Sequence, residues 1–227
     1  MVADFASLRT QFPGTSRRTY MNVAARGLMT TGSRAAIDRM LDARLYGEAD
    51  KAAMFDIIES SRRRYAALIN AEPDEIAITK NVSEGLNAII ASYDWQRGDN
   101  AVICPDLEHP NNVFPWRNLA KRTGMDVKTV APRDGQISVE AIADAIDGKT
   151  RMVTASSVTF APGFRTDIAA IAKLCREKDI LFLVDGVQSV GILHTDVSEL
   201  GIEAMAVSTQ KGLLGLYGMG FLYCRRE

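Results

Sequence analysis

The chain has 227 residues, of which 47% are hydrophobic and 24% are charged, and its formal net charge is −1 at pH 7. This composition is typical of a globular protein and excludes a disordered or fibrous chain. Because 27 basic residues are balanced by 28 acidic ones without a basic run, we expect neither nucleic acid nor a membrane surface as a partner.

The first third of the chain predicts an irregular arm followed by two helices. The arm includes residues 20–25, of sequence YMNVAA, and the helices are expected over residues 33–46 and 52–70. We assign residues 1–73 to this N-terminal part, whose helices would pack on a larger domain formed by residues 74–227.

From about residue 74, short apolar runs rich in β-branched residues alternate with longer segments of helical period. This alternation predicts a three-layer α/β/α fold with a mainly parallel, seven-stranded sheet. The segment before the last strand is short and rich in glycine, which leaves no room for a crossover helix and predicts that this strand is antiparallel. Strands are expected over residues 75–79, 100–104, 126–130, 151–155, 180–184, 204–208 and 220–224, and helices over 83–93, 113–122, 139–145 and 167–177.

Cysteine usage and the N-terminus predict where the protein works. Cys104, Cys175 and Cys224 are far apart and form no CxxC pair, which suits a reducing compartment and offers neither a disulfide framework nor a zinc site. Residues 1–5 lack the basic start of a secretory signal, and no apolar stretch reaches the roughly 18 residues of a membrane helix. We therefore expect a cytoplasmic protein with no bound metal.

Ligands of open α/β sheets bind beyond the carboxyl ends of the strands, where four loops of this chain carry polar groups. The first loop, residues 79–85, leads into a helix whose free N–H groups, with the Ser83 hydroxyl, would suit a phosphate. Asn81 and Glu84 also have the spacing of a capping pair, which is the simpler interpretation of this loop taken alone. In the second loop, the His109 imidazole would either stack on a planar ring or make only local hydrogen bonds.

The third and fourth loops carry a carboxylate and an amine. Asp185 follows an apolar run that is typical of a strand buried on both faces, so its carboxylate needs a partner such as a protonated pyridine nitrogen. Gln188 would then approach a ring hydroxyl, although Asp185 is equally suited to cap a helix. Lys211 also follows a strand, where burial would lower its pKa and make the amine nucleophilic, whereas most loop lysines are solvated.

A phosphate site, a stacking group, a carboxylate for a ring nitrogen and a lysine for an aldehyde are together the groups that bind pyridoxal 5'-phosphate (PLP). The segments VDGVQS at residues 184–189 and STQKG at residues 208–212, with the glycine-rich tail that follows, resemble the class V aminotransferase family of fold-type I PLP enzymes. This family includes cysteine desulfurases, isopenicillin-N epimerase-like proteins and kynureninase. The resemblance runs from about Tyr20 to Tyr223.

The resemblance implies a role for each site residue and a homodimeric enzyme that acts on an amino acid. Lys211 would be the Schiff-base lysine, which the substrate amine displaces from PLP and which then acts as a base. Asp185 would pair with the pyridine nitrogen, Gln188 would approach the ring hydroxyl, and His109 would stack on the ring. The groups expected at the phosphate are Ser83, Ser208 and Gln210 with the backbone of Val82 and Ser83, and those expected near the substrate are Asn22 and Ala25.

The chain also departs from one branch of the family. Cysteine desulfurases typically have two adjacent histidines where this chain has His109-Pro110, and a histidine where it has Gln210. Their sulfur-carrying cysteine and their carboxylate-binding arginine belong to a C-terminal small domain, which the resemblance implies is absent from these 227 residues.

We therefore expect an aminotransferase-like transferase with a Lys211 internal aldimine. A cysteine desulfurase, another lyase or an epimerase of the same family is the alternative. A non-catalytic PLP-binding domain is the alternative from another class. A nucleotide-binding enzyme fits poorly, because residues 215–220 lack the GxGxxG order and precede a strand.

Overall fold

The structure, a computed structural model, describes residues 4–226. The predicted N-terminal arm begins at residue 1, so its first three residues, on which the expectation about a secretory signal partly rests, lie outside the described residues. Within residues 4–226, no helix combines the length and the apolar character needed to cross a bilayer.

The core of the protein is one seven-stranded sheet with the strand order β1-β7-β6-β5-β4-β2-β3. Strand β7 pairs antiparallel with β1 on one side and with β6 on the other, and the remaining neighbours are parallel. The predicted mainly parallel sheet with an antiparallel last strand is therefore confirmed. The strands are β1 (Ile76–Thr79), β2 (Asn100–Ile103), β3 (Asp126–Thr129), β4 (Thr150–Ser156), β5 (Leu181–Asp185), β6 (Ala204–Ser208) and β7 (Gly220–Cys224).

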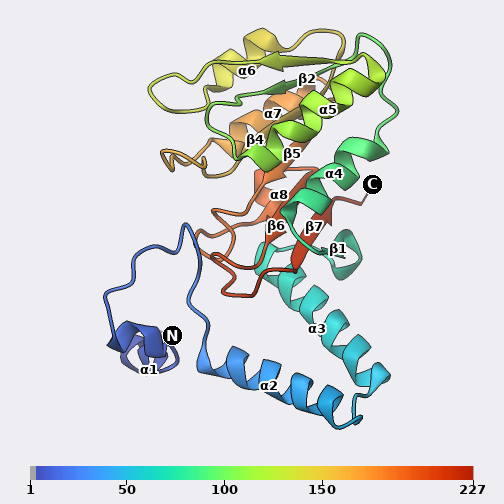
Figure 1. The fold of residues 1–227 in the computed structure, drawn as a ribbon. Coiled ribbons are helices and arrows are strands. Elements are labelled where there is room, and N and C mark those ends of the chain that lie inside the picture. The colour runs from blue at the N-terminus through green and yellow to red at the C-terminus, as the bar shows by residue number, and fades with distance from the viewer. Residues whose placement is uncertain (1–3, 227) are drawn as a thin grey trace.

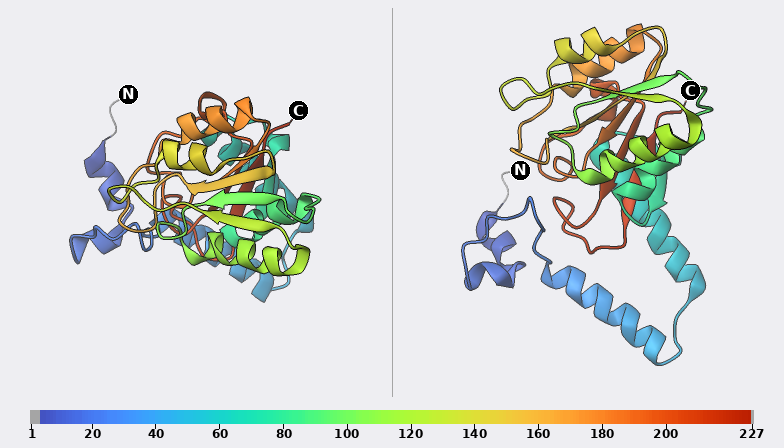
Figure 2. Two further views of the ribbon diagram at one scale, coloured as in Figure 1. Left: turned by 90° about the horizontal axis from the view of Figure 1, so that it is seen from above. Right: turned by 45° about the horizontal axis from the view of Figure 1, so that its top comes forward.

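Helices cover both faces of this sheet, as Figures 1 and 2 show. One hydrophobic cluster contains side chains of α6 (Val139–Ala145), α7 (Ile168–Glu177) and α8 (Val197–Leu200), and the other contains side chains of α4 (Val82–Ser92) and α5 (Phe114–Thr123). Neighbouring residues of β5 enter different clusters, since Phe182 packs in the first and Leu183 in the second. Both side chains are fully buried, as expected for a strand covered on both faces.

The N-terminal helices α2 (Thr31–Leu45) and α3 (Lys51–Ile69) extend away from the sheet (Figure 1). Helix α2 contains no buried residue, and α3 contributes only Tyr65, Ala66 and Ile69 to the core, all in its last turns. Apart from the half-buried Ile37, the other large apolar side chains of these two helices are exposed, for example Leu45 at 75% and Phe55 at 55%. This part of the chain therefore carries far more uncovered apolar surface than the sheet domain.

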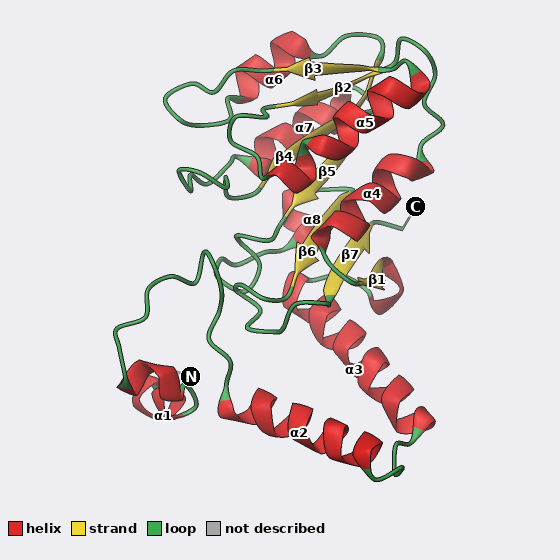
Figure 3. Ribbon diagram, viewed as in Figure 1, coloured by secondary structure: helices red, strands yellow, loops and turns green. Residues whose placement is uncertain are grey.

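All six predicted helices are present, and their ends differ from the predicted ones by at most two residues. The sequence did not predict α1 (Phe5–Thr10), α8, or the short 3-10 helices at Pro13–Ser16, Pro73–Glu75 and Pro110–Asn112. Figure 3 shows that these short helices and the long loops lie at the ends of the strands or in the N-terminal arm.

Candidate functional site

The carboxyl ends of the strands surround a cavity of about 370 Å³. This volume is within the range of small-molecule sites. Of the predicted site residues, Asn22 is not part of the lining. The predicted residues that do line the cavity are Ala25, Val82, Ser83, His109, Asp185, Gln188, Ser208, Gln210 and Lys211.

The start of helix α4 forms one end of the cavity. The Asn81 side chain accepts a hydrogen bond from the Glu84 N–H at 2.9 Å, so the capping interpretation of this loop is confirmed. The Val82 N–H donates to the Ser208 hydroxyl oxygen at 2.7 Å, which connects the start of α4 to the end of β6. With its oxygen occupied as an acceptor, the Ser208 hydroxyl is left with its proton to donate. Because the Val82 and Glu84 N–H groups already have partners, the donors that would suit an anion at this end are the Ser83 N–H and the hydroxyls of Ser83 and Ser208.

Asp185 is the last residue of β5, and its side chain is buried with 4% of the residue exposed. Burial raises the pKa of its carboxyl to about 6, opposed by the Val187 N–H, by the charge of Lys211 and by the Asn111 side chain. No helix begins after Asp185, because residues 187–189 form a turn and Val190 is in an isolated β-bridge, so the alternative of a helix cap is wrong. A buried carboxylate with these partners would be stabilised by a further proton donor placed in the cavity.

Lys211 lies in the loop that joins β6 to β7. Burial lowers the pKa of its amine, and the nearby Asp185 and Tyr217 act in the opposite direction. The loop is held by Thr209, whose hydroxyl lies 2.8 Å from the Leu216 oxygen and 3.1 Å from the Met219 oxygen. A half-buried lysine on a fixed loop, with a lowered pKa, is a more competent nucleophile than a solvated one.

His109 lies on the opposite wall and is exposed to the cavity and to solvent. Its Nδ1 lies 2.6 Å from the Asn111 Oδ1, to which it donates when protonated, and 3.2 Å from the Asn111 N, from which it accepts when unprotonated. In either tautomer the expected local hydrogen bond to Asn111 is present. The ring also meets Phe160 edge-on, with a centroid distance of 4.7 Å. These contacts leave a ring face available for a ligand, so the local and the stacking interpretations are compatible.

Glu108 precedes His109 and is buried beneath it, with 5% of the residue exposed. Its carboxyl accepts from the Ser156 N–H at 2.6 Å, the Ser156 hydroxyl at 2.5 Å and the Asn112 amide at 2.9 Å. The network ends at Thr154, whose hydroxyl donates to Asn112 at 3.0 Å. Glu108 therefore attaches the His109 loop to strand β4.

Sequence reasoning did not single out several of the residues that line the cavity. The carboxyl-end rule led to the loops after the strands, but Ser156 is the last residue inside a strand, and Tyr217 lies far along a glycine-rich loop. Asn111 was within the second loop and could have been found as a polar neighbour of His109. The residues missed are Ala24, Asn111, Ser156, Phe160, Val187 and Tyr217, and Asn81 was predicted only as a helix cap.

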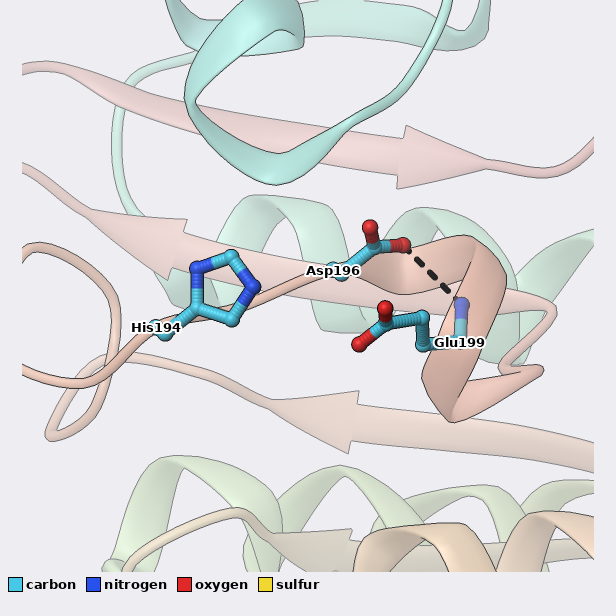
Figure 4. A group of neighbouring side chains, drawn as sticks. All are labelled: His194, Asp196 and Glu199. Atoms are coloured by element: carbon cyan, nitrogen blue, oxygen red, sulfur yellow. Dashed lines mark hydrogen bonds between the residues drawn. The ribbon is translucent and has the colours of Figure 1, made fainter.

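His194, Asp196 and Glu199 form a second polar group away from this cavity (Figure 4). Their potential ligand atoms lie within 4.8 Å of one another. Asp196 caps α8 by accepting from the Ser198 and Glu199 N–H groups at 2.9 Å, and it also accepts from the Asn70 amide at 2.7 Å. These contacts explain the position of Asp196, and we assign no ion to the group.

The fold and the cavity define an α/β protein with a lysine and a buried aspartate in one cavity beyond the strand ends. Comparison with known proteins identifies the family. The family model for aminotransferase class-V matches residues 44–227. The chain is 38% identical over 171 residues to a probable cysteine desulfurase of Methanothermobacter thermautotrophicus, which covers 75% of this chain and 42% of that protein. It is 31% identical to an uncharacterized aminotransferase, YcbU, of Bacillus subtilis, over 96% of this chain and 58% of that protein. The chain therefore belongs to the class V aminotransferase family.

Solved structures support the same fold. A C-DES lysine-to-alanine mutant, with glycine covalently linked to its PLP cofactor, is 30% identical and superposes with a TM-score of 0.88. The match covers 96% of this chain and 59% of the C-DES chain. The 227 residues thus span about half the length of the relatives that they match.

Proposed function

We propose that this chain binds PLP in the cavity beside Lys211 and contributes the cofactor site of an enzyme that transforms an amino acid. The proposal depends mainly on one observation, namely that Lys211, Asp185 and the start of α4 line the same cavity. Membership in the class V aminotransferase family supports it, as does the PLP cofactor of C-DES.

The residues present fit the chemical groups of PLP. The hydroxyls of Ser83 and Ser208, the Ser83 N–H and Gln210 would hold the phosphate, while the Val82 N–H would orient the Ser208 hydroxyl. Asp185 would keep a proton on the ring nitrogen, because a cationic partner offsets the cost of its buried charge. His109 would cover the ring, and Gln188 would approach the ring hydroxyl. Further contacts to a substrate would come from the arm, at Ala25 and, although it is not part of the lining, Asn22.

Bound PLP would serve as an electron sink for a carbanion at the substrate Cα. Lys211 would hold the cofactor aldehyde and, when released by the substrate amine, would offer a neutral Nζ to accept the Cα proton. Its lowered pKa favours the neutral form that both tasks need. We propose a transaminase-like reaction, because Gln210 replaces the histidine typical of desulfurases. Desulfuration remains the alternative, supported by the cysteine desulfurase among the relatives.

The test of cofactor binding is reductive labelling. The purified chain is incubated with PLP, reduced with borohydride and digested, and mass spectrometry locates the phosphopyridoxyl group. We expect the label on Lys211, its loss in Lys211→Ala, and full labelling in Lys178→Ala, which alters an exposed lysine after α7. Labelling of Lys211→Ala to the wild-type level would refute the assignment of Lys211 as the lysine that binds PLP.

An amino-acid screen separates the enzyme from a domain that only binds the cofactor. We expect at least one amino acid to change the visible absorbance of the PLP-loaded chain and to be converted into a product. Retention of PLP at Lys211 without either change would favour the non-catalytic alternative, which the chain's coverage of about half of its relatives motivates.

We further propose that the protein is a cytoplasmic homodimer. The exposed apolar side chains of α2 and α3 support the dimer, because surface of this kind marks a protein interface. Three unpaired cysteines, two of them buried, support a reducing compartment.

A further inference from the structure

The N-terminal arm makes a fixed turn against the loop that carries Lys211. The Ala25 and Arg26 N–H groups both donate to the Asn22 oxygen at 3.2 Å, and the Tyr20 hydroxyl donates to the Arg26 oxygen at 2.6 Å. The Gly27 N–H then donates to the Gln210 oxygen at 2.8 Å. The arm is thus hydrogen-bonded directly to the residue before the lysine.

This junction tolerates no side chain at Gly27. A Cβ there would lie 2.4 Å from the Lys211 oxygen and 2.8 Å from the Leu214 side chain. The turn is therefore packed against the lysine loop, and its position is set by the same backbone that places Lys211.

The turn presents the Arg26 side chain at the mouth of the cavity. Its guanidinium lies over the ring of Tyr217, 5.2 Å from the centroid, with Nη2 3.5 Å from the Tyr217 hydroxyl. Tyr217 lines the cavity and acts on the charge of Lys211, and Ala24 and Ala25 of the arm line the same cavity. Stacking on a ring restricts the guanidinium plane and leaves its N–H edge free to bind.

The charge of Arg26 is not balanced within the described part of the chain. None of the ion pairs between residues 4 and 226 includes Arg26, so its nearest described partner is the Tyr217 ring. An unpaired guanidinium beside a ligand cavity is suited to a planar anion, which it can bind through two parallel hydrogen bonds.

We propose that Arg26 binds a carboxylate of the amino-acid substrate at the mouth of the Lys211 cavity. This inference rests on the proposed function, because it assumes that the substrate amine reaches Lys211. Two carboxylates share this chemistry, namely the α-carboxylate of any amino acid and the side-chain carboxylate of an acidic one. Arg26 thereby adds a specificity-determining contact from the arm, outside the strand ends that hold the cofactor.

The experiment compares amino-acid affinities of the wild-type and Arg26→Gln chains. Each protein is first loaded with PLP, and loading is verified by borohydride labelling of Lys211. Calorimetric titrations then give the Kd of L-alanine, L-aspartate and L-glutamate. Arg18→Gln, which removes an exposed charge from the same arm, is the matched control.

We expect Arg26→Gln to weaken binding roughly tenfold or more, the scale of a charge-assisted hydrogen bond. Equal losses for alanine and the acidic amino acids would identify the α-carboxylate, and a loss confined to aspartate and glutamate would identify the side-chain carboxylate. The affinity of Arg26→Lys should lie between those of the wild-type and Arg26→Gln chains, because lysine keeps the charge but lacks the planar guanidinium.

The result that overturns the proposal differs from the one that overturns PLP binding. Equal affinities of the wild-type and Arg26→Gln chains, or no amino-acid binding by the PLP-loaded wild-type chain, would refute the role of Arg26. Failure of both proteins to be labelled at Lys211 would instead refute the proposed function, and the inference about Arg26 with it.

Discussion

Two buried carboxyls lie close enough to influence each other beside the cavity. Glu108 and Asp185 have raised pKa values of about 7 and about 6, with burial as the largest cause in both. The charge of Asp185 is a further cause of the rise at Glu108. Near neutral pH, Glu108 therefore retains a proton for part of the time, and its hydrogen-bond network at β4 is sensitive to pH.

We predict that Glu108 makes the chain less stable as the pH rises through neutrality. In the unfolded chain its pKa is near 4.5, so between this value and about 7 the folded state binds a proton that the unfolded state has lost. The free energy of unfolding therefore falls over this interval, by about 3 kcal/mol for this one group. Asp185 should contribute a smaller fall at lower pH for the same reason.

The variant Glu108→Gln should remove most of that fall. Urea unfolding of the apo chain between pH 5 and pH 8 gives the free energy at each pH, and we expect a flatter profile for the variant. Glu48→Gln, at an exposed position, should retain the wild-type profile. Parallel profiles for wild type and Glu108→Gln would contradict the prediction.

The sequence predicted several cavity-lining residues from the loops that follow the strands. Lys211, Asp185 and His109 were found this way, Ser208 was named from the family resemblance, and all four line the cavity. Glu108, Arg26 and Tyr217 were not singled out, because their positions depend on how loops distant in sequence meet. The buried state of Glu108, in particular, depends on Ser156 of another strand, which the local sequence does not indicate.

At the scale of elements, helix α4 is the best-packed support of the site. It contacts β6 and β7, and its start binds Ser208 at the end of β6. Gly85 allows this close approach, since a Cβ there would lie 2.9 Å from the Ala206 Cβ.

We predict that Gly85→Ala destabilises the chain even though alanine favours helices. Overpacking of this kind costs about 1–3 kcal/mol, which exceeds the roughly 1 kcal/mol gained in helix propensity. Gly32→Ala in α2 is the control, because its added Cβ would meet only the Thr30 hydroxyl oxygen, at an ordinary contact distance of 3.8 Å. Urea midpoints should fall for the first variant and remain equal or rise for the second. A higher urea midpoint for Gly85→Ala than for the wild-type chain would contradict the prediction and show that α4 can move away from β6 at little cost.

Prediction of helices was accurate for those of seven or more residues and failed for shorter ones. The seven residues of α6 were predicted with their exact bounds, whereas α8 has four residues and α1 has six. These short helices depend on caps, such as the Asp4 and Asp196 side chains, and on tertiary packing. Periodicity therefore cannot detect them.

At the scale of the whole molecule, the uncovered face of α3 is the feature to be explained. Met54, Phe55, Ile57 and Ile58 are all exposed, and their spacing places them on one broad side of the helix. Exposed apolar surface of this extent marks a protein interface, which supports the proposed dimer.

We predict that the PLP-loaded chain sediments as a dimer at micromolar concentration and that Phe55→Glu with Ile58→Glu shifts it to monomer. Charged side chains at a buried interface carry a desolvation cost that exceeds the free energy of a small interface. Lys178→Glu changes the net charge by the same amount at an exposed site after α7 and should leave the dimer intact. An unchanged sedimentation coefficient for the α3 variant would exclude this helix from the interface.

Strand β7 has a consequence for how the protein is made. It is the last strand in sequence, yet it lies between β1 and β6, so Ile76 pairs with Tyr223 across almost the whole domain. On the ribosome, β1 and β6 keep open edges until residues 220–224 emerge, and open edges invite aggregation. The loop of Lys211 and the start of α4 are brought together only when β7 docks. Acquisition of ligand affinity should therefore be among the last events of folding, and a useful time marker for its completion.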